Sequence, residues 1–201
     1  MKLILFCSLA AVFSLTSWES QAAQITNAKA AELSLHRIER LVILKKIEES
    51  FQSKVKSLSL VLLPHQDPTE ASFKATIFQY PATDGSQKSI DIILNEDGKA
   101  IGQTVNAGGE ALGAPTWPDP NKDPVTLAEN SLHYILEGAV TKPELLPYFN
   151  GLTSFAITQE TNSEGIIHAV VDIGAGPENP ILRIRIKTNG DYESAEFLPM
   201  P

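Results

Sequence analysis

The segment AELSLHRI at residues 31–38 returns almost unchanged as AENSLHYI at residues 128–135. At the helical period of about 3.6 residues, the apolar residues of each segment lie along one face of a helix. In both segments this apolar stripe continues for one more helical turn. The pattern therefore predicts two helices whose shared letters face a hydrophobic core. The stripe positions are Ala31, Leu35, Ile38 and Val42 in the first copy, and Ala128, Leu132, Ile135 and Ala139 in the second.

Each copy also carries a glutamate and a histidine four residues apart, Glu32 with His36 and Glu129 with His133. Both pairs lie on a flank of the helix away from the apolar stripe, where side chains four apart can touch. We interpret them as surface pairs, each formed within one helix. A metal-ligand or acid–base role for the two histidines is the alternative.

Strand signals follow each helical segment, because β-branched and aromatic residues alternate with polar ones and turn residues separate the runs. The dipeptides Asp97-Gly98 and Asn189-Gly190 are typical of tight hairpin turns. The expected strands are residues 57–63, 73–80, 89–95 and 99–105 in the first half, and residues 152–159, 166–173, 181–187 and 192–197 in the second.

The order helix, helix, four strands thus occurs twice. The sequence predicts an α+β fold of two tandem repeats, each a pair of helices packed on one face of a four-stranded antiparallel sheet. The first repeat is expected over residues 25–106 and the second over residues 124–198. Between them, residues 107–123 are rich in glycine and proline, which indicates a linker.

The chain begins with Met1-Lys2, an apolar run over residues 3–15 and the small residues Ala22-Ala23, which is the pattern of a secretory signal peptide over residues 1–22. The apolar run is shorter than the roughly 20 residues that span a bilayer as a helix. The only cysteine, Cys7, lies in this segment, so disulfides and cysteine chemistry are excluded from the rest of the chain.

The net charge is −8, and it stays the same without residues 1–22. An acidic surface disfavours nucleic acid and anionic lipid, which are bound by clustered Lys and Arg. We therefore expect a bacterial periplasmic or secreted protein whose partner is neither nucleic acid nor membrane.

The tandem order of helices and antiparallel strands, with hairpins such as IILNEDGKAIGQTV at residues 92–105, resembles PepSY-type domains. The doubled arrangement also resembles the beta-lactamase inhibitor protein, although the disulfides of that protein are absent here. The resemblance implies a secreted module that binds or inhibits other secreted proteins. It carries no binding residue over to this chain.

Alternation along the strands predicts which side chains the helices leave uncovered. Outward positions hold aromatic residues and arginines, which are enriched at interface hot spots. Trp117 stands in the proline-stiffened linker, where it could anchor a partner or cover a junction. The outward residues could equally cover a second layer or be solvated. The candidate partner-binding residues are Phe78, Tyr80, Trp117, Arg183 and Arg185.

Enzymatic and metal signals are weak in comparison. His168 and Asp172 share a strand face but are expected about 13 Å apart, too far for a catalytic dyad. Residues 119–123 imitate the start of a calcium loop, yet Pro124 stands where the loop needs glycine. The better interpretation is that Asp123 or Thr126 caps the following helix.

We therefore expect a non-enzymatic protein-binding module that needs no cofactor, with inhibition or regulation of another secreted protein as its candidate role. The alternative is a hydrolase or small-ligand carrier with a pocket between the two repeats.

Overall fold

The computed structural model describes residues 25–63, 71–117, 123–187 and 189–199. The predicted signal peptide, residues 1–22, lies outside the described residues, as does most of the predicted calcium-like stretch.

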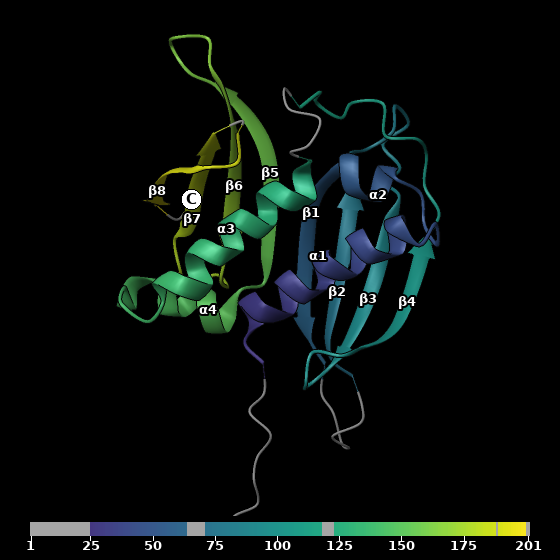
Figure 1. Ribbon diagram of the computed structural model, residues 1–201, viewed down its shortest axis with the longest axis horizontal. Coiled ribbons are helices and arrows are strands. Elements are labelled where there is room, and N and C mark those ends of the chain that lie inside the picture. Colours follow the sequence, from purple (N-terminus) through teal and green to yellow (C-terminus); the bar gives the residue numbers. More distant parts are fainter. Residues whose placement is uncertain (1–24, 64–70, 118–122, 188, 200–201) are drawn as a thin grey trace, which may run out of the picture.

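The helices and strands follow the chain in the order shown in Figure 1. The strands begin and end within about two residues of the predicted bounds. The helical elements are α1 (Asn27–Ile43), α2 (Ser50–Ser53), α3 (Pro124–Gly138), the 3-10 helix η1 (Pro143–Leu145) and α4 (Leu146–Gly151). The strands are β1 (Val55–Leu62), β2 (Ala71–Gln79), β3 (Ser89–Asn95), β4 (Ala100–Asn106), β5 (Ser154–Thr161), β6 (Ile167–Gly174), β7 (Ile181–Lys187) and β8 (Tyr192–Leu198).

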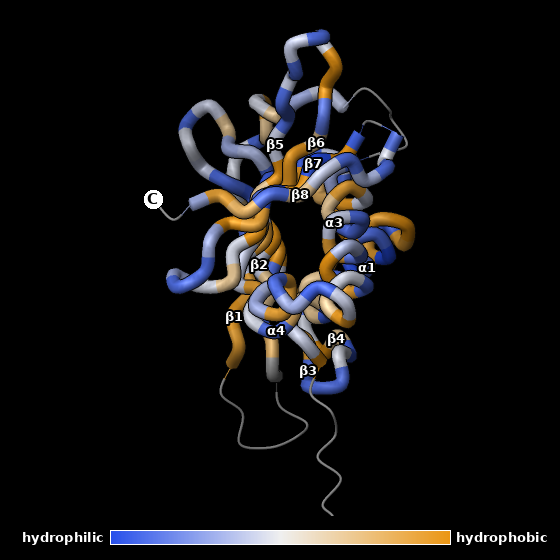
Figure 2. The backbone as a smooth tube through the Cα atoms, turned by 90° about the vertical axis from the view of Figure 1, so that its left-hand side faces the viewer, coloured by the Kyte–Doolittle hydropathy of each residue, from blue (hydrophilic) through white to orange (hydrophobic). Residues whose placement is uncertain are grey.

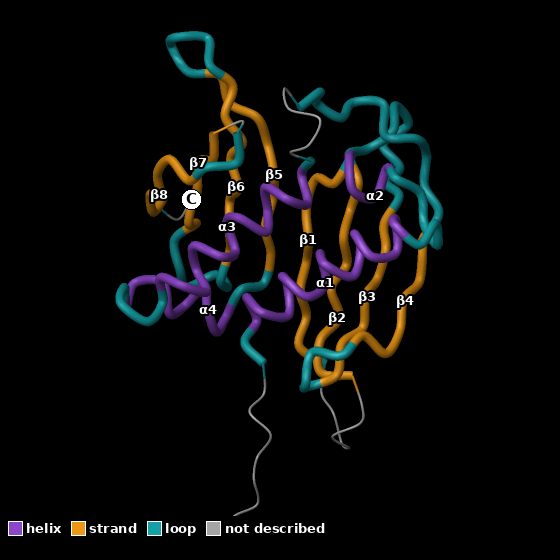
Figure 3. The backbone as a smooth tube through the Cα atoms, in the orientation of Figure 1, coloured by secondary structure: helices purple, strands orange, loops and turns teal. Residues whose placement is uncertain are grey.

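The described strands form one continuous antiparallel sheet of eight, in the order β4-β3-β2-β1-β5-β6-β7-β8. The prediction of two tandem helix-helix-four-strand repeats is therefore wrong, although the α+β class holds. The sheet continues because β1 pairs with β5, with residues 57–59 opposite residues 154–156. The helices lie over one face of this sheet, and α1 also packs against α3 and α4 (Figures 1 and 3).

The buried side chains of the helices and the sheet form a single hydrophobic core, and Figure 2 shows hydrophobic stretches along the backbone of both layers. The stripe of the repeated segment contributes to it as predicted, since Leu35, Ile38, Leu132 and Ile135 are fully buried. Alternation along β2, β3 and β7 turns every second apolar residue toward the helices, and these residues are buried as well: Phe73, Ala75, Ile77, Ile90, Ile92, Leu94, Leu182, Ile184 and Ile186. Within the described part of the chain, no helix has the length and apolar character needed to cross a membrane.

The two long helices begin at side chains that accept hydrogen bonds from free backbone N–H groups. Thr26 accepts from Lys29 N at 3.3 Å before α1, and Asp123 accepts from Thr126 N at 3.0 Å before α3. Of the two predicted caps for α3, the structure thus selects Asp123. Asp123 also accepts from Gln52 Nε2 at 2.7 Å, which ties the start of α3 to α2.

The segment after β4 folds back on the first half of the chain. Gly108 lies so close to the backbone of Gln87 and Lys88 that a Cβ atom would be 2.3 Å from it. The amide of Gly109 donates to Ser86 Oγ at 2.8 Å. Further along, Ala111 is buried and Trp117 packs against the core. The described part of the predicted linker is therefore packed against the protein.

Because both halves share one sheet and one core, Leu132→Ala should destabilise the whole chain. Removing this buried side chain is expected to cost about 2–5 kcal/mol. In urea unfolding, the transition seen by Trp117 fluorescence and that seen by far-UV circular dichroism should shift together. Two separate transitions, with the Trp117 transition unmoved, would show that the halves fold independently.

Candidate functional site

The Glu–His pairs of the repeated segment meet across the crossing of α1 and α3. His36 Nε2 of α1 lies 3.3 Å from Glu129 Oε1 of α3, and His133 Nε2 of α3 lies 3.5 Å from Glu32 Oε1 of α1. The prediction of surface pairs within each helix is therefore wrong. Each glutamate points into the helix interface, where Glu32 is 2% and Glu129 is 9% exposed. We call Glu32, His36, Glu39, Glu129 and His133 the α1–α3 cluster.

The two buried glutamates of the cluster differ in how their charge is balanced. Glu32 pairs with Lys29, three residues earlier on the same helix, as well as with His133. Glu129 has only His36 as an ion-pair partner among the described residues. Although His36 is close, Glu129 Oε1 is buried and has no hydrogen-bond partner among the described residues. Glu129 is therefore the less stabilised carboxylate.

The surroundings of Glu129 strongly favour its protonated form. Burial raises the pKa of Glu129 to about 8, and the carboxylates of Glu39, Asp123 and Glu32 add to the rise. Burial also raises the pKa of Glu39, although His36 opposes the rise. Within the described part of the chain, His36, Glu39 and Glu129 form the group with the donor atoms and spacing to hold a metal ion.

A second set of candidate residues lies on the sheet face opposite the helices, which we call the open face. Phe78 of β2 is half-buried there, opposite Ser57 of β1 and Ser89 of β3 in the strand register. Tyr80 reaches over the sheet and donates its hydroxyl to Ile157 O at 2.8 Å. Phe78 is thus an aromatic ring between two small side chains, while the hydroxyl of Tyr80 is already used.

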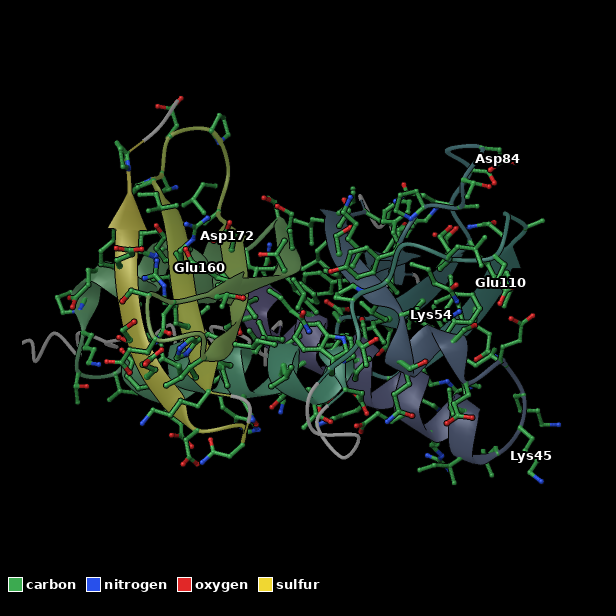
Figure 4. All side chains as sticks on the ribbon, turned by 90° about the horizontal axis from the view of Figure 1, so that it is seen from above. Lys45, Lys54, Asp84, Glu110, Glu160 and Asp172 are labelled. Carbon is green, nitrogen blue, oxygen red and sulfur yellow. The ribbon has the colours of Figure 1, made fainter. Side chains whose placement is uncertain are left out.

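The outward arginines of β7 are held in ion pairs with neighbouring strands. Arg183 donates two hydrogen bonds of 2.7 Å to Asp172, and this pairing raises the pKa of its guanidinium. Arg185 lies between Glu160, at 3.0 Å, and Glu196, at 2.7 Å. Figure 4 shows Asp172 and Glu160 on this part of the sheet. Neither arginine is a free cation on the open face.

Trp117 lies beside a cavity of about 340 Å³ at the junction of the two halves. The indole is half-buried, and its Nε1 is buried without a hydrogen-bond partner among the described residues. Lys54 reaches the cavity from the first half and Asp123 from the start of α3. The structure therefore places Trp117 apart from Phe78 and the arginines. The described lining is Ser53, Lys54, Ala114, Pro115, Thr116, Trp117 and Asp123.

His168 has a partner that sequence reasoning missed. Its Nδ1 lies 2.7 Å from Glu193 Oε2 of β8, and its side chain is almost fully buried. As predicted, Asp172 is not its partner, since Asp172 pairs with Arg183. The strand register shifts between Arg185 and Ile186, near Glu193. Alternation alone cannot foresee such an irregularity, so the sequence held no signal for this contact.

Comparison with known proteins identifies no relative. No family model matches the chain, and neither a curated protein nor a solved structure matches it. The resemblance to PepSY-type domains and to the beta-lactamase inhibitor protein is therefore neither confirmed nor contradicted.

The raised pKa of Glu129 predicts how stability changes with pH. A carboxyl that binds its proton more tightly in the folded state gives stability that is complete below about pH 4.5 and lost as the pH rises through about 8. Glu129→Gln has no such loss. Between pH 5 and pH 9, the free energy of unfolding of the wild type should therefore fall by on the order of 1–3 kcal/mol relative to that of Glu129→Gln. Both proteins are measured in a buffer with a chelator.

Urea unfolding at both pH values measures this difference. The matched control is Glu137→Gln, which changes an exposed glutamate of the same helix and should follow the wild type. A Glu129→Gln difference that stays constant from pH 5 to pH 9 would contradict the assignment.

Proposed function

We propose that the chain is a non-enzymatic protein-binding module that contacts its partner through the open face of β1, β2 and β3. The supporting observation is Phe78, a partly exposed aromatic ring that stands between Ser57 and Ser89. Because Phe78 is only half-buried, part of its ring remains accessible to a partner. Aromatic side chains in such settings often dominate the free energy of protein–protein binding.

The surroundings of Phe78 suit a protein partner. Across the same face, Val61 of β1, Lys74 of β2 and Ile93 of β3 lie in one cross-strand row. Lys74 Nζ is 2.9 Å from Asp91 Oδ2, and Asp91 also accepts from Thr76 Oγ1 at 2.7 Å. The face therefore combines apolar side chains with polar groups that already have partners, so a partner can cover it without leaving unpaired charges.

Arg183 and Arg185 take a lesser role in this proposal than the sequence suggested. Their acidic neighbours neutralise them within the sheet. A partner that competed for either arginine would leave a carboxylate unpaired, which costs free energy. Both arginines therefore fit the margin of the contact better than its centre.

The place of action is part of the proposal. The predicted signal peptide at residues 1–22 and the net charge of −8 support a periplasmic or secreted protein. The resemblance to PepSY-type domains supports a partner that is itself secreted, and a role as its inhibitor or regulator.

A small-ligand carrier is the second candidate, and the cavity beside Trp117 favours it. A ligand that accepted a hydrogen bond from the unpartnered Nε1 would remove an unfavourable buried donor. Such a ligand would change Trp117 fluorescence and leave the open face free. Protein binding at the open face would depend on Phe78 instead, so the two functions are separable.

The protein-binding function predicts that Phe78→Ala weakens partner binding on the order of 30-fold, as expected for a central aromatic residue. Partner capture from the envelope and secreted fractions of the source cells identifies the partner. Titration of the purified partner then measures the affinities of the wild type and the variant.

Val140→Ala is the matched control, because it shortens an aliphatic side chain that is 87% exposed after α3, away from the open face. Circular dichroism verifies that both variants are folded. If Phe78→Ala and Val140→Ala bind the partner as well as the wild type, the open face is not the contact.

A further inference from the structure

The α1–α3 cluster brings three potential metal ligands together from two helices. His36 and Glu39 lie three residues apart on α1, so their side chains point from the same side of that helix. Glu129 reaches them from α3. One ligand atom from each of the three residues lies within 4.8 Å of the other two.

The spacing suits a small transition-metal ion. Zinc binds imidazole nitrogen and carboxylate oxygen at about 2.0–2.2 Å, so two ligands of a tetrahedral site are about 3.4 Å apart. His36 Nε2 and Glu129 Oε1 are 3.3 Å apart, close to that separation. Small rotations of the partly exposed Glu39 side chain can bring its carboxylate to the same point. The exposure of His36 leaves room for water as a fourth ligand.

The environment of Glu129 is a second observation that favours a cation at this place. This residue is 9% exposed, and its Oε1 faces His36 without a hydrogen bond. A buried carboxylate without such a partner is unfavourable, because it has lost its hydration and gained little in return. A cation beside Oε1 would provide both the charge and the ligand contact.

Three other described side chains beside these residues already have partners. Glu32 pairs with Lys29 and with His133, which leaves neither Glu32 nor His133 as a ready ligand. Asp123 accepts hydrogen bonds from the start of α3 and from Gln52. Among the described residues, those left to bind a cation here are therefore His36, Glu39 and Glu129.

We propose that His36, Glu39 and Glu129 form a binding site for a divalent transition-metal ion of the zinc type. One imidazole and two carboxylates are a ligand set that zinc accepts, whereas calcium prefers six or more oxygens. The bound ion clamps α1 to α3, and so fixes the helix layer over the junction of β1 and β5. This site is distinct from the open face, and its existence does not depend on the proposed function.

The test uses untagged protein, freed of metal with a chelator that is then removed, and titrated with zinc chloride in a calorimeter. We expect one zinc ion to bind per chain. His36→Gln and Glu39→Gln should each weaken binding at least roughly tenfold, because each removes a direct ligand. Glu137→Gln, an exposed change on α3, should bind as the wild type does.

Two further measurements separate a coordinated ion from surface binding. Cobalt in place of zinc should give the visible absorption of a tetrahedral site in the wild type and lose it in Glu39→Gln. Zinc should also raise the melting temperature of the wild type but not of Glu39→Gln, because the ion binds the folded state only. Absence of zinc binding, or equal zinc affinity in Glu39→Gln and Glu137→Gln, would overturn the proposal.

Discussion

The crossing of α1 and α3 is the constraint on which the rest of the structure depends. The sheet is continuous only through β1 and β5, whose ladder is confined to residues 57–59 and 154–156. Beyond this short ladder, the halves are joined by the packing of α1 against α3 and α4, and by hydrogen bonds from Gln52 to Asp123 and from Tyr80 to Ile157. The same packing buries Glu32 and Glu129, so the crossing joins the two halves and also creates the charged cluster.

Much of the local structure could be predicted from the sequence, because it depends on neighbours along the chain. Alternation placed Ile90, Ile92 and Leu94 on the buried face of β3, and the helical stripe placed Leu35 and Leu132 in the core. The continuity of the sheet could not be predicted in this way. It depends on pairing between β1 and β5, whose facing residues include Ser57, Ser59 and Ser154, and serine gives no signal for which strand lies beside it.

The candidate sites show the same limit. Outward positions such as Phe78 and Arg183 followed from alternation, but the neutralisation of Arg183 by Asp172 required the register of β6 and β7. The spacing of glutamate and histidine was visible in the sequence. It predicted a contact within each helix, between side chains four residues apart, whereas the observed contacts run between α1 and α3. The crossing of the helices turned both glutamates inward and exchanged their partners. Identical residues in two segments can therefore indicate that the two segments pack against each other, as well as that they form the same secondary structure.

The central claim is that each histidine of the repeated segments contacts the glutamate of the other helix and not the one on its own helix. A double-mutant cycle tests it most directly, with His36→Ala and Glu129→Gln alone and combined, and unfolding free energies measured in the presence of a chelator. A second cycle combines His36→Ala with Glu32→Gln, a pair within α1. The account predicts a coupling energy of about 0.5–3 kcal/mol between His36 and Glu129, and one near zero between His36 and Glu32. Coupling within α1 that exceeds the coupling between the helices would contradict it.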